Sequence, residues 1–220
     1  MTTALSAYVV GCATLTFPEG FPEQNRDDVN NSIIFSELAS NRRYNRLTQR
    51  SDWYASFLTV LGQIGWMNEG SIRFDSIPNG GSTSVDDLVI TTLQQSLSDS
   101  ELNSVRDTIR ALQSGNDAQA KLFNGQATDG GSGKQANFGI GPCRMDDDNA
   151  SCMFNAFDFT FSGSTSSSGA LFQELSQGDT SFGGQVKMTL NANVYNMIRD
   201  SIVEKLQGAD AGNLVKEITL

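Results

Sequence analysis

The sequence predicts an α+β protein: an N-terminal helical half packed on a largely antiparallel sheet from the C-terminal half, with one late amphipathic helix and a C-terminal strand. Two patterns predict this class. Apolar residues recur at helical spacing through much of 29–112, and they alternate at period two between residues 152 and 161. Because helices and strands come in separate runs, an antiparallel sheet is favoured over a doubly wound parallel one.

The first half is expected to open with a strand over 7–17 and to continue with helices. Two aspartates at 27 and 28 can cap a helix that runs over about 29–40. The next helix, over about 51–66, carries apolar residues on most sides, so we expect it to be central and buried. A short alternating strand is expected at 71–77.

The following helices have polar residues suited to cap their first turns. Ser84 opens a helix over about 84–97. Ser98 and Glu101 form a capping box, in which the serine oxygen accepts a backbone N–H and the glutamate reaches back. Asp117 can cap a short turn. Helical starts are therefore predicted near residues 84, 98 and 117.

The second half begins with a predicted hairpin of residues 137–143 and 152–161. Phe157, Phe159 and Phe161 share one face of its second strand, which is typical of a strand that faces a core. The remaining elements follow in order: strands at 170–175 and 185–190, a helix capped by Asn191 or Asn193 and ended by Gly208, and a strand at 214–220.

A chain of 220 residues suits a single domain, 1–220. The Gly/Ser-rich stretch 128–135 is the best candidate for an internal boundary, because glycine and serine favour flexible connections. This stretch would join a mainly helical part, 1–127, to a mainly β part, 136–220.

Charge and composition exclude several classes of function. The chain has 15 Lys+Arg, 25 Asp+Glu and a net charge of −10, which argues against nucleic acid or an anionic membrane as an electrostatically held partner. It contains no histidine. Serine or cysteine nucleophiles activated by histidine, and zinc bound through histidine, are therefore excluded.

Sequence signals for membranes, export and cofactors are missing. No window approaches 18 consecutive apolar residues, so we expect no transmembrane segment. No Lys or Arg precedes Arg26, so no secretory signal is recognised and a cytoplasmic location is favoured at synthesis. The Gly-Lys stretch 130–135 lacks the first glycine and the Ser/Thr of a P-loop, and no Gly-x-Ser-x-Gly occurs. We expect no cofactor.

The most distinctive charged feature is a cluster of four arginines, Arg42, Arg43, Arg46 and Arg50, with no carboxylate among them. Guanidinium groups suit carboxylates and phosphates, so the cluster is a candidate site for an anion or an acidic partner. The alternative is that these side chains pair with the protein's own surplus of carboxylates or face water.

Acidic residues suggest two further sites. Asp146, Asp147 and Asp148 offer oxygen ligands for calcium, although a tight turn with solvated charges is the commoner outcome for such a loop. Asp158 lies on the face of its strand opposite to Phe157 and Phe159, so we expect it to face outward. If buried, it would have a raised pKa and be a candidate general acid.

The three cysteines are Cys12, Cys143 and Cys152. Cys143 and Cys152 flank the acidic loop, and strand pairing around that loop could place their sulfurs opposite each other, so a disulfide is sterically plausible. Without an export signal, three reduced and partly buried thiols are the favoured interpretation.

We therefore expect a non-catalytic protein that acts through its surface. It would self-assemble, as a homo-oligomer, or bind a protein partner through patches of opposite charge. One alternative is a membrane-acting or toxin-like protein whose helices or polar loops rearrange on a target surface. Another is a carboxylate-dependent hydrolase, which requires a cleft with two facing carboxylates or a lysine beside a serine or thiol.

Overall fold

Eight strands and seven α-helices form the part of the chain that the structure, a computed structural model, describes: residues 5–78, 81–113, 117–129, 134–163, 169–209 and 211–220. The strands are β1 (Ser6–Val10), β2 (Ala13–Phe17), β3 (Trp66–Asn68), β4 (Asp75–Ser76), β5 (Gln135–Asp146), β6 (Asn149–Thr160), β7 (Thr180–Leu190) and β8 (Val215–Ile218). The helices are α1 (Glu23–Asn41), α2 (Arg50–Gln63), α3 (Val85–Leu93), α4 (Asp99–Leu112), α5 (Ala118–Ala127), α6 (Ala192–Asn196) and α7 (Arg199–Gly208), with 3₁₀ turns η1 (Ala170–Phe172) and η2 (Ala211–Leu214).

All strands belong to one sheet with the order β3-β7-β6-β5-β2-β1-β8, and β4 also pairs with β7. The pairs are antiparallel except β2 with β5, which is parallel. The long strands β5 and β6 form the predicted hairpin, and β7 pairs with β6 to extend it into a continuous antiparallel meander. The predicted α+β class with a largely antiparallel sheet is confirmed.

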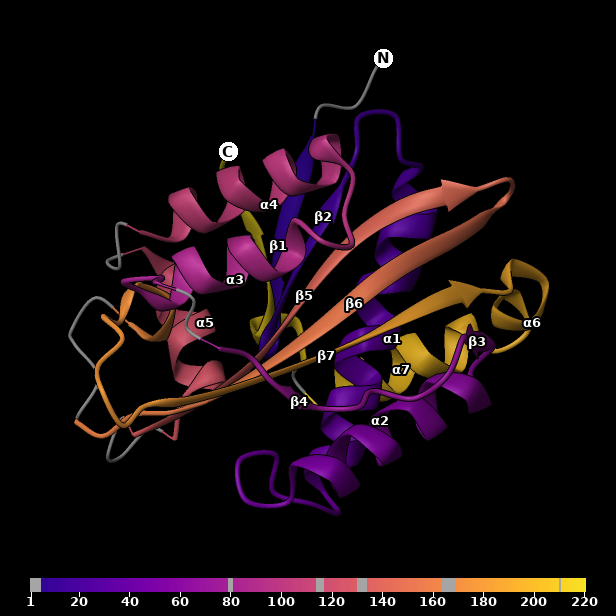
Figure 1. Cartoon of the computed structure of the whole chain (residues 1–220). Helices are drawn as coiled ribbons and strands as arrows, with labels where there is room; N and C mark the ends of the chain where they lie inside the picture. The colour runs from indigo at the N-terminus through magenta and orange to yellow at the C-terminus, as the bar shows by residue number, and fades with distance from the viewer. Residues whose placement is uncertain (1–4, 79–80, 114–116, 130–133, 164–168, 210) are drawn as a thin grey trace.

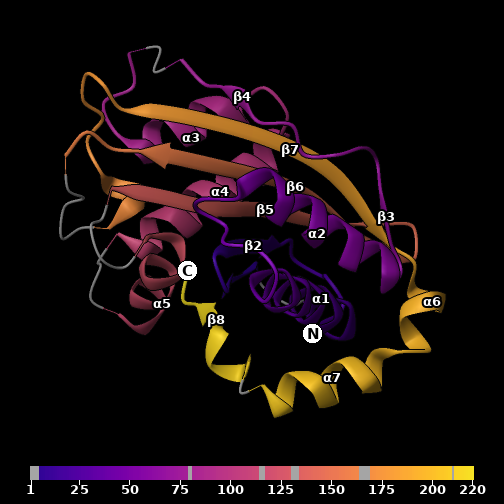
Figure 2. The same ribbon diagram turned by 90° about the horizontal axis from the view of Figure 1, so that it is seen from below.

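Helices cover both faces of the sheet, so the molecule has three layers (Figure 1). Figure 1 shows α3 and α4 on one side of β5, β6 and β7, with α1 and α2 on the other, and in the view of Figure 2 α2 lies in front of these strands while α3 and α4 lie behind them. Each side has its own core: one contains buried residues of α1, α2, α6 and α7, and the other contains those of α3, α4 and α5. Each strand in the middle of the sheet is therefore buried on both faces.

The predicted first strand is a hairpin of two strands. β1 and β2 pair in the register Val10 with Ala13, and the chain turns at Gly11 and Cys12. Gly11 has φ +56°, a left-handed conformation that glycine adopts without steric cost. A Cβ at this position would also collide with the carboxylate of Glu37. The turn therefore depends on glycine.

Two helix boundaries in the first half differ from those expected. α1 starts at Glu23, and the residue before it, Pro22, makes no side-chain cap, so the aspartates at 27 and 28 lie inside the helix. α2 ends at Gln63, and Trp66 begins strand β3 because Gly65, with φ +102°, reverses the chain. Of the expected strand at 71–77, only β4 forms a ladder.

Helix capping follows the sequence closely. The Ser98 hydroxyl accepts the N–H of Glu101, and the Glu101 carboxylate accepts the N–H of Ser98, which is the predicted capping box of α4. Asp117 accepts the N–H of Ala120 at the start of α5. Asn191 accepts two backbone N–H groups at the start of α6. Caps are local interactions, so local sequence predicts them.

Two elements of the second half are corrected. Of the strand expected at 170–175, residues 170–172 form the 3₁₀ turn η1, whose buried Ala170 and Leu171 pack under α3, and Glu174 makes only an isolated antiparallel bridge with Ser84. The expected late helix is divided into α6 and α7, since the backbone at Ile198 has φ −123° and leaves the helical range. β8 forms near the predicted position and pairs with β1.

The stretch 128–135 lies partly outside the described residues. Strands from both sides of it share one sheet, since β2 pairs with β5 and β1 pairs with β8. The two candidate parts, 1–127 and 136–220, therefore contribute to the same cores.

Candidate functional site

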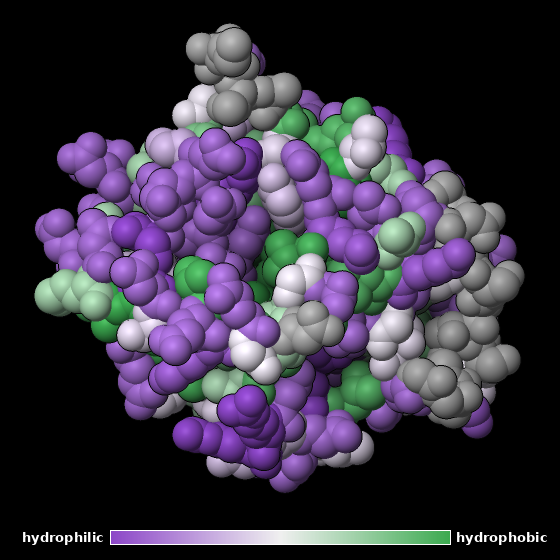
Figure 3. Space-filling model, turned by 180° about the vertical axis from the view of Figure 1, so that it is seen from behind, coloured by the Kyte–Doolittle hydropathy of each residue, from purple (hydrophilic) through white to green (hydrophobic). Residues whose placement is uncertain are grey.

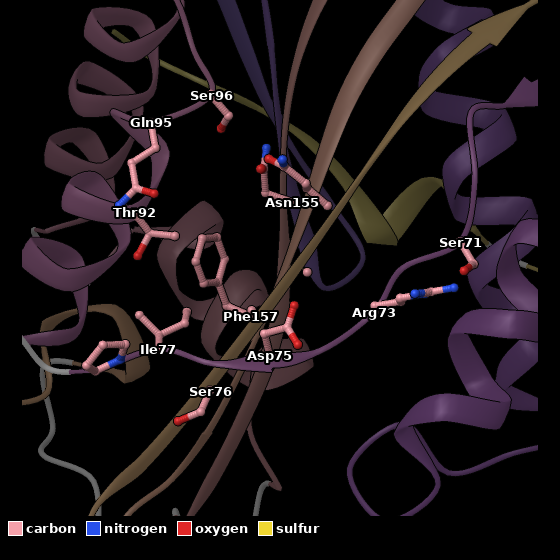
Figure 4. Close-up of a pocket in the computed structure, with 14 residues that line it drawn as sticks. Ser71, Arg73, Asp75, Ser76, Ile77, Thr92, Gln95, Ser96, Asn155 and Phe157 are labelled. Carbon is pink, nitrogen blue, oxygen red and sulfur yellow. The ribbon is translucent and has the colours of Figure 1, made fainter.

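A polar groove of the described molecule has a volume of about 610 Å³ and lies between α3, the segment 71–78 and the strands β6 and β7. Figure 4 shows Thr92 and Gln95 on one side, Ser71 and Arg73 on the other, and Asn155 and Phe157 between them. Its size lies within the range usual for small-molecule sites. The groove is thus assembled from four separate segments of the chain.

Two adjacent glycines allow the segment 71–78 to form one wall. A Cβ on Gly183 would lie 2.6 Å from the Cδ1 atom of Ile77, and a Cβ on Gly184 would collide with the carbonyl oxygen of Arg73. Glycine in a strand interior commonly marks such a close approach of another backbone. The Gly183-Gly184 pair therefore lets the segment cross β7 and enclose the groove.

Several polar side chains of the groove have no hydrogen-bond or ion-pair partner in the described parts of the chain. Thr92 donates its hydroxyl to the carbonyl of Leu88, and Asn155 donates its amide to backbone carbonyls, so both are satisfied within the protein. In contrast, within the described parts of the chain several lining side chains have no hydrogen-bond or ion-pair partner: the charged and amide groups of Arg73, Asp75, Gln95 and Gln185, and the hydroxyls of Ser71 and Ser76. These groups are free to contact a ligand.

The chemistry of the groove is that of binding. Its lining holds a single carboxylate, Asp75, and contains no lysine or cysteine. Glycoside hydrolysis uses two carboxyl groups that flank the bond, and acyl transfer without histidine needs another base next to a nucleophile. Neither arrangement is present among the residues that line this groove.

A second groove, of about 640 Å³, contains two carboxylates, Asp86 and Glu174. Asp86 accepts the hydroxyl of Ser84 at the start of α3, which is a local structural contact. Glu174 is exposed to solvent. The acid of a glycosidase lies in a desolvated environment that favours its protonated form, so this pair does not support the hydrolase alternative.

The structure separates the arginine cluster into one buried member, one half-buried member and two exposed members. The side chain of Arg46 is 8% exposed and lies 3.6 Å from the Glu37 carboxylate, and that of Arg50 lies 2.7 Å from Asp158. Arg42 and Arg43 are exposed. Arg46 and Arg50 therefore pair with the protein's own carboxylates, and the four arginines do not form one surface.

Glu37 brings a carboxylate next to a thiol in the interior. Both of its oxygens accept the backbone N–H of Cys12, at 3.1 and 3.2 Å. Burial raises the pKa of the Cys12 thiol, an effect that the Arg46 guanidinium opposes. Because Cys12 is 2% exposed and lines none of the described pockets, this pair has no access to a substrate. It holds the β1–β2 turn instead.

Asp158 lies on the predicted face of its strand, but it does not face outward. Its side chain is 14% exposed, because α2 covers that face of the sheet. It accepts hydrogen bonds from Arg50 and from Asn137, whose amide oxygen accepts the hydroxyl of Tyr54. Burial raises the pKa of Asp158, against the hydrogen bonds of Asn137 and Arg50. The network crosses the interface between α2 and the sheet.

The acidic loop forms the turn between β5 and β6, where Asp147 has φ +53°. Partial burial works to raise the pKa of Asp146, but the hydrogen bond and charge of Arg144, with the charge of Lys187, lower it. Among the residues that the structure describes, no group of three Cys, Asp or Glu side chains is placed to hold a metal ion. The calcium site at Asp146, Asp147 and Asp148 has no geometric support and stays a prediction.

Cys143 and Cys152 are opposite each other in the β5–β6 ladder, as expected for strands that pair around the acidic loop. Both are buried and both thiols are free. Burial and the neighbouring Cys152 sulfur raise the pKa of Cys143. The two residues thus place two thiols next to each other in the interior, and the disulfide between them stays a prediction.

The groove residues were not predicted from the sequence. Segment 71–78 reads as an ordinary short strand, and Gln95 and Gln185 as ordinary polar positions. The only local signal was the Gly183-Gly184 pair inside a strand, which indicates a close backbone approach but not its partner.

Comparison with known proteins does not assign a family. No known family matches the chain, and no curated protein sequence matches it. A solved structure titled "DELTA-ENDOTOXIN" is 11% identical, with 79% of this chain and 83% of that chain covered and a TM-score of 0.42. "Structure of the Evf virulence factor" is 12% identical, with 83% and 76% covered and a TM-score of 0.32. At these scores the likenesses carry no argument about function.

Proposed function

We propose that the protein works by recognition and not by catalysis, and that the groove between α3, segment 71–78 and β7 binds an uncharged, hydroxyl-rich ligand such as an oligosaccharide. The observation that supports this is the set of four charged or amide side chains, without partners in the described chain, around one groove: Arg73, Asp75, Gln95 and Gln185.

The chemistry of these groups determines the ligand class. Glutamine amides both donate and accept hydrogen bonds, Arg73 only donates, and Asp75 only accepts. A hydroxyl group can satisfy either kind of partner, so a ligand with several hydroxyls matches the whole set. The single cation and single anion of the lining balance each other, which favours a neutral ligand over a charged one.

Binding to an array of neutral and sialylated oligosaccharides tests the proposal. We expect binding of neutral oligosaccharides that weakens by at least about fivefold in Asp75→Asn and in Gln95→Ala, because each loses a hydrogen bond to the ligand. Glu174→Gln, in the second groove, is the matched control and should bind like the parent. Absence of binding to every array member, or equal binding by all variants, would contradict the proposal.

Self-assembly is the second candidate function, and it rests on two exposed arginines instead of the four that the sequence suggested. Arg42 and Arg43 are exposed and have no ion-pair partner in the described part of the molecule, whose net charge is −10. Such cations can contact the acidic surface of a second copy. None of the described helices has the length and apolar character to cross a bilayer. The membrane-acting or toxin-like alternative stays a prediction.

Light scattering coupled to size exclusion, at low and high salt, tests self-assembly. We expect a dimer or larger species at low salt that dissociates at high salt, because exposed ion pairs are screened. Arg43→Glu should dissociate it also at low salt. A monomer at high protein concentration and low salt contradicts this candidate and leaves the oligosaccharide proposal intact.

A further inference from the structure

A third groove, mainly apolar, lies between α1 and α7, on the opposite side of the sheet from the polar groove of about 610 Å³. It has a volume of about 380 Å³, and the two helices pack side by side. Figure 3 views the molecule from the side of α7 and β8 and shows hydrophobic patches that lie between hydrophilic side chains. The lining combines a small apolar floor with two cations: Phe35, Leu38, Ala39, Leu206, Arg42 and Lys205.

The two cations are not neutralised by the protein. Neither Arg42 nor Lys205 forms an ion pair in the described parts of the chain, although the molecule has an excess of carboxylates. The Nζ atom of Lys205 lies 5.9 Å from the ring centroid of Phe35, so one cation is held over the apolar floor. Positive charge beside an apolar floor is complementary to an anionic head group on a hydrocarbon chain.

A rigid contact keeps this groove formed. Arg199, the first residue of α7, donates two hydrogen bonds of 2.7 Å to the carboxylate of Asp28 in α1. This bidentate pair fixes α7 against α1 at the end of α7 distant from the groove. The groove is therefore a feature of the folded protein and does not need a ligand to open.

We infer that the α1–α7 groove binds the monomeric anion of a medium- or long-chain fatty acid. The hydrocarbon chain lies on Phe35, Leu38 and Leu206, and the carboxylate contacts Arg42 and Lys205. The inference is independent of the oligosaccharide proposal, because the two grooves share no residue. A volume of about 380 Å³ is at the small end of ligand sites, which favours a single chain over a two-chain lipid.

Calorimetric titration with dodecanoate below its micellar concentration tests the inference on the full-length protein. We expect saturable binding and an increase in melting temperature, with no binding of dodecyltrimethylammonium, which has the same chain and the opposite charge. Arg42→Gln and Lys205→Gln should each weaken dodecanoate binding by at least about fivefold, since each removes a charge-assisted contact. Lys121→Gln is the control, because Lys121 is exposed, forms no ion pair in the described parts of the chain and does not line the groove.

Three results would overturn the inference. The first is the absence of saturable dodecanoate binding by the folded parent protein. The second is equal loss in Lys121→Gln and Arg42→Gln, which would show non-specific attraction. The third is binding to phosphatidylcholine vesicles without binding to monomeric dodecanoate, which would assign the surface to a bilayer. Each variant is first checked for a cooperative thermal transition, and Arg42 and Lys205, both exposed, tolerate substitution.

Discussion

The two sides of the sheet are stabilised in different ways. On the side of α1 and α2, buried and half-buried charges form ion pairs between elements: Glu37 with Arg46, Asp158 with Arg50, and Asp28 with Arg199. On the side of α3, α4 and α5, the core is aromatic and aliphatic, and Phe138 stacks with Phe159. The described charged residues that are fully buried, Asp28, Glu37 and Arg46, all lie on the first side.

This difference indicates that the two sides respond to different changes. A buried ion pair is sensitive to the loss of one partner, because the other charge is left in a medium of low polarity. An apolar core responds mainly to volume and to buried area, and it has no dependence on pH. Four predictions test this contrast, from the largest expected effect to the smallest.

Removing the charge of Glu37 should have the largest effect. Glu37→Gln leaves Arg46 buried without a counter-charge, and we expect a loss of about 3–5 kcal/mol in the free energy of unfolding. Urea denaturation measures it, with the exposed Arg43→Gln as the control that changes little. The double variant Glu37→Met/Arg46→Met should recover much of the loss. A loss below about 1 kcal/mol in the single variant would show that the pair is not a main contact of this side.

Oxidation of Cys143 and Cys152, which belong to the core on the side of α1 and α2, should have the second-largest effect on stability. Opposite residues of antiparallel strands have Cα separations that a disulfide can span. A dithiol oxidant such as diamide would take up the two electrons and two protons released as the S–S bond forms. We expect a stabilisation of about 2 kcal/mol and one remaining thiol, Cys12, in a thiol titration of the unfolded protein. Three titratable thiols after oxidation would contradict the prediction.

The apolar side should tolerate a conservative change. Phe138→Leu keeps most of the buried volume, so we expect a loss of roughly 1 kcal/mol. The loss should be the same at pH 5 and pH 8, because no buried charge of the described residues lies on this side. Thermal unfolding at the two pH values measures it. A pH-dependent loss would show that the two sides are coupled.

The smallest effect concerns Asp158. Its pKa is raised by burial, so the folded state favours the protonated acid, and the stability gained from that form is lost as pH rises through the folded pKa. Asp158→Asn removes the titration. Relative to the parent, the variant should therefore gain roughly 0.5 kcal/mol between pH 3.5 and pH 7. A shift in the parent's favour would mean that Arg50 lowers the pKa more than burial raises it.

Sequence patterns predicted the elements better than their environment. The capping box at Ser98 and the caps at Asp117 and Asn191 form as predicted, since each involves residues within three positions of each other. The face of Asp158 was also predicted. Its burial was not, because a period-two pattern identifies two faces of a strand and cannot indicate whether helices cover both.

The candidate sites show the same limit. Arg50 and Asp158 are 108 positions apart, and the residues of the polar groove come from four separate segments. No local pattern indicates which arginine meets which carboxylate, or that Gln95 and Gln185 line one cavity. The arginine cluster was prominent in the sequence because its members are near each other in the chain, yet the fold pairs Arg46 and Arg50 with internal carboxylates and exposes the other two.

The sequence by itself determined the α+β class, the long hairpin, the caps at Ser98, Asp117 and Asn191, and the absence of histidine chemistry. These depend on composition and on contacts between near neighbours in the chain. Only the tertiary structure decided that the sheet is covered twice, that Gly183 and Gly184 admit a crossing segment, and that Arg42 and Lys205 meet at one groove. These features depend on which distant segments become neighbours, and that is set by the packing of the whole chain.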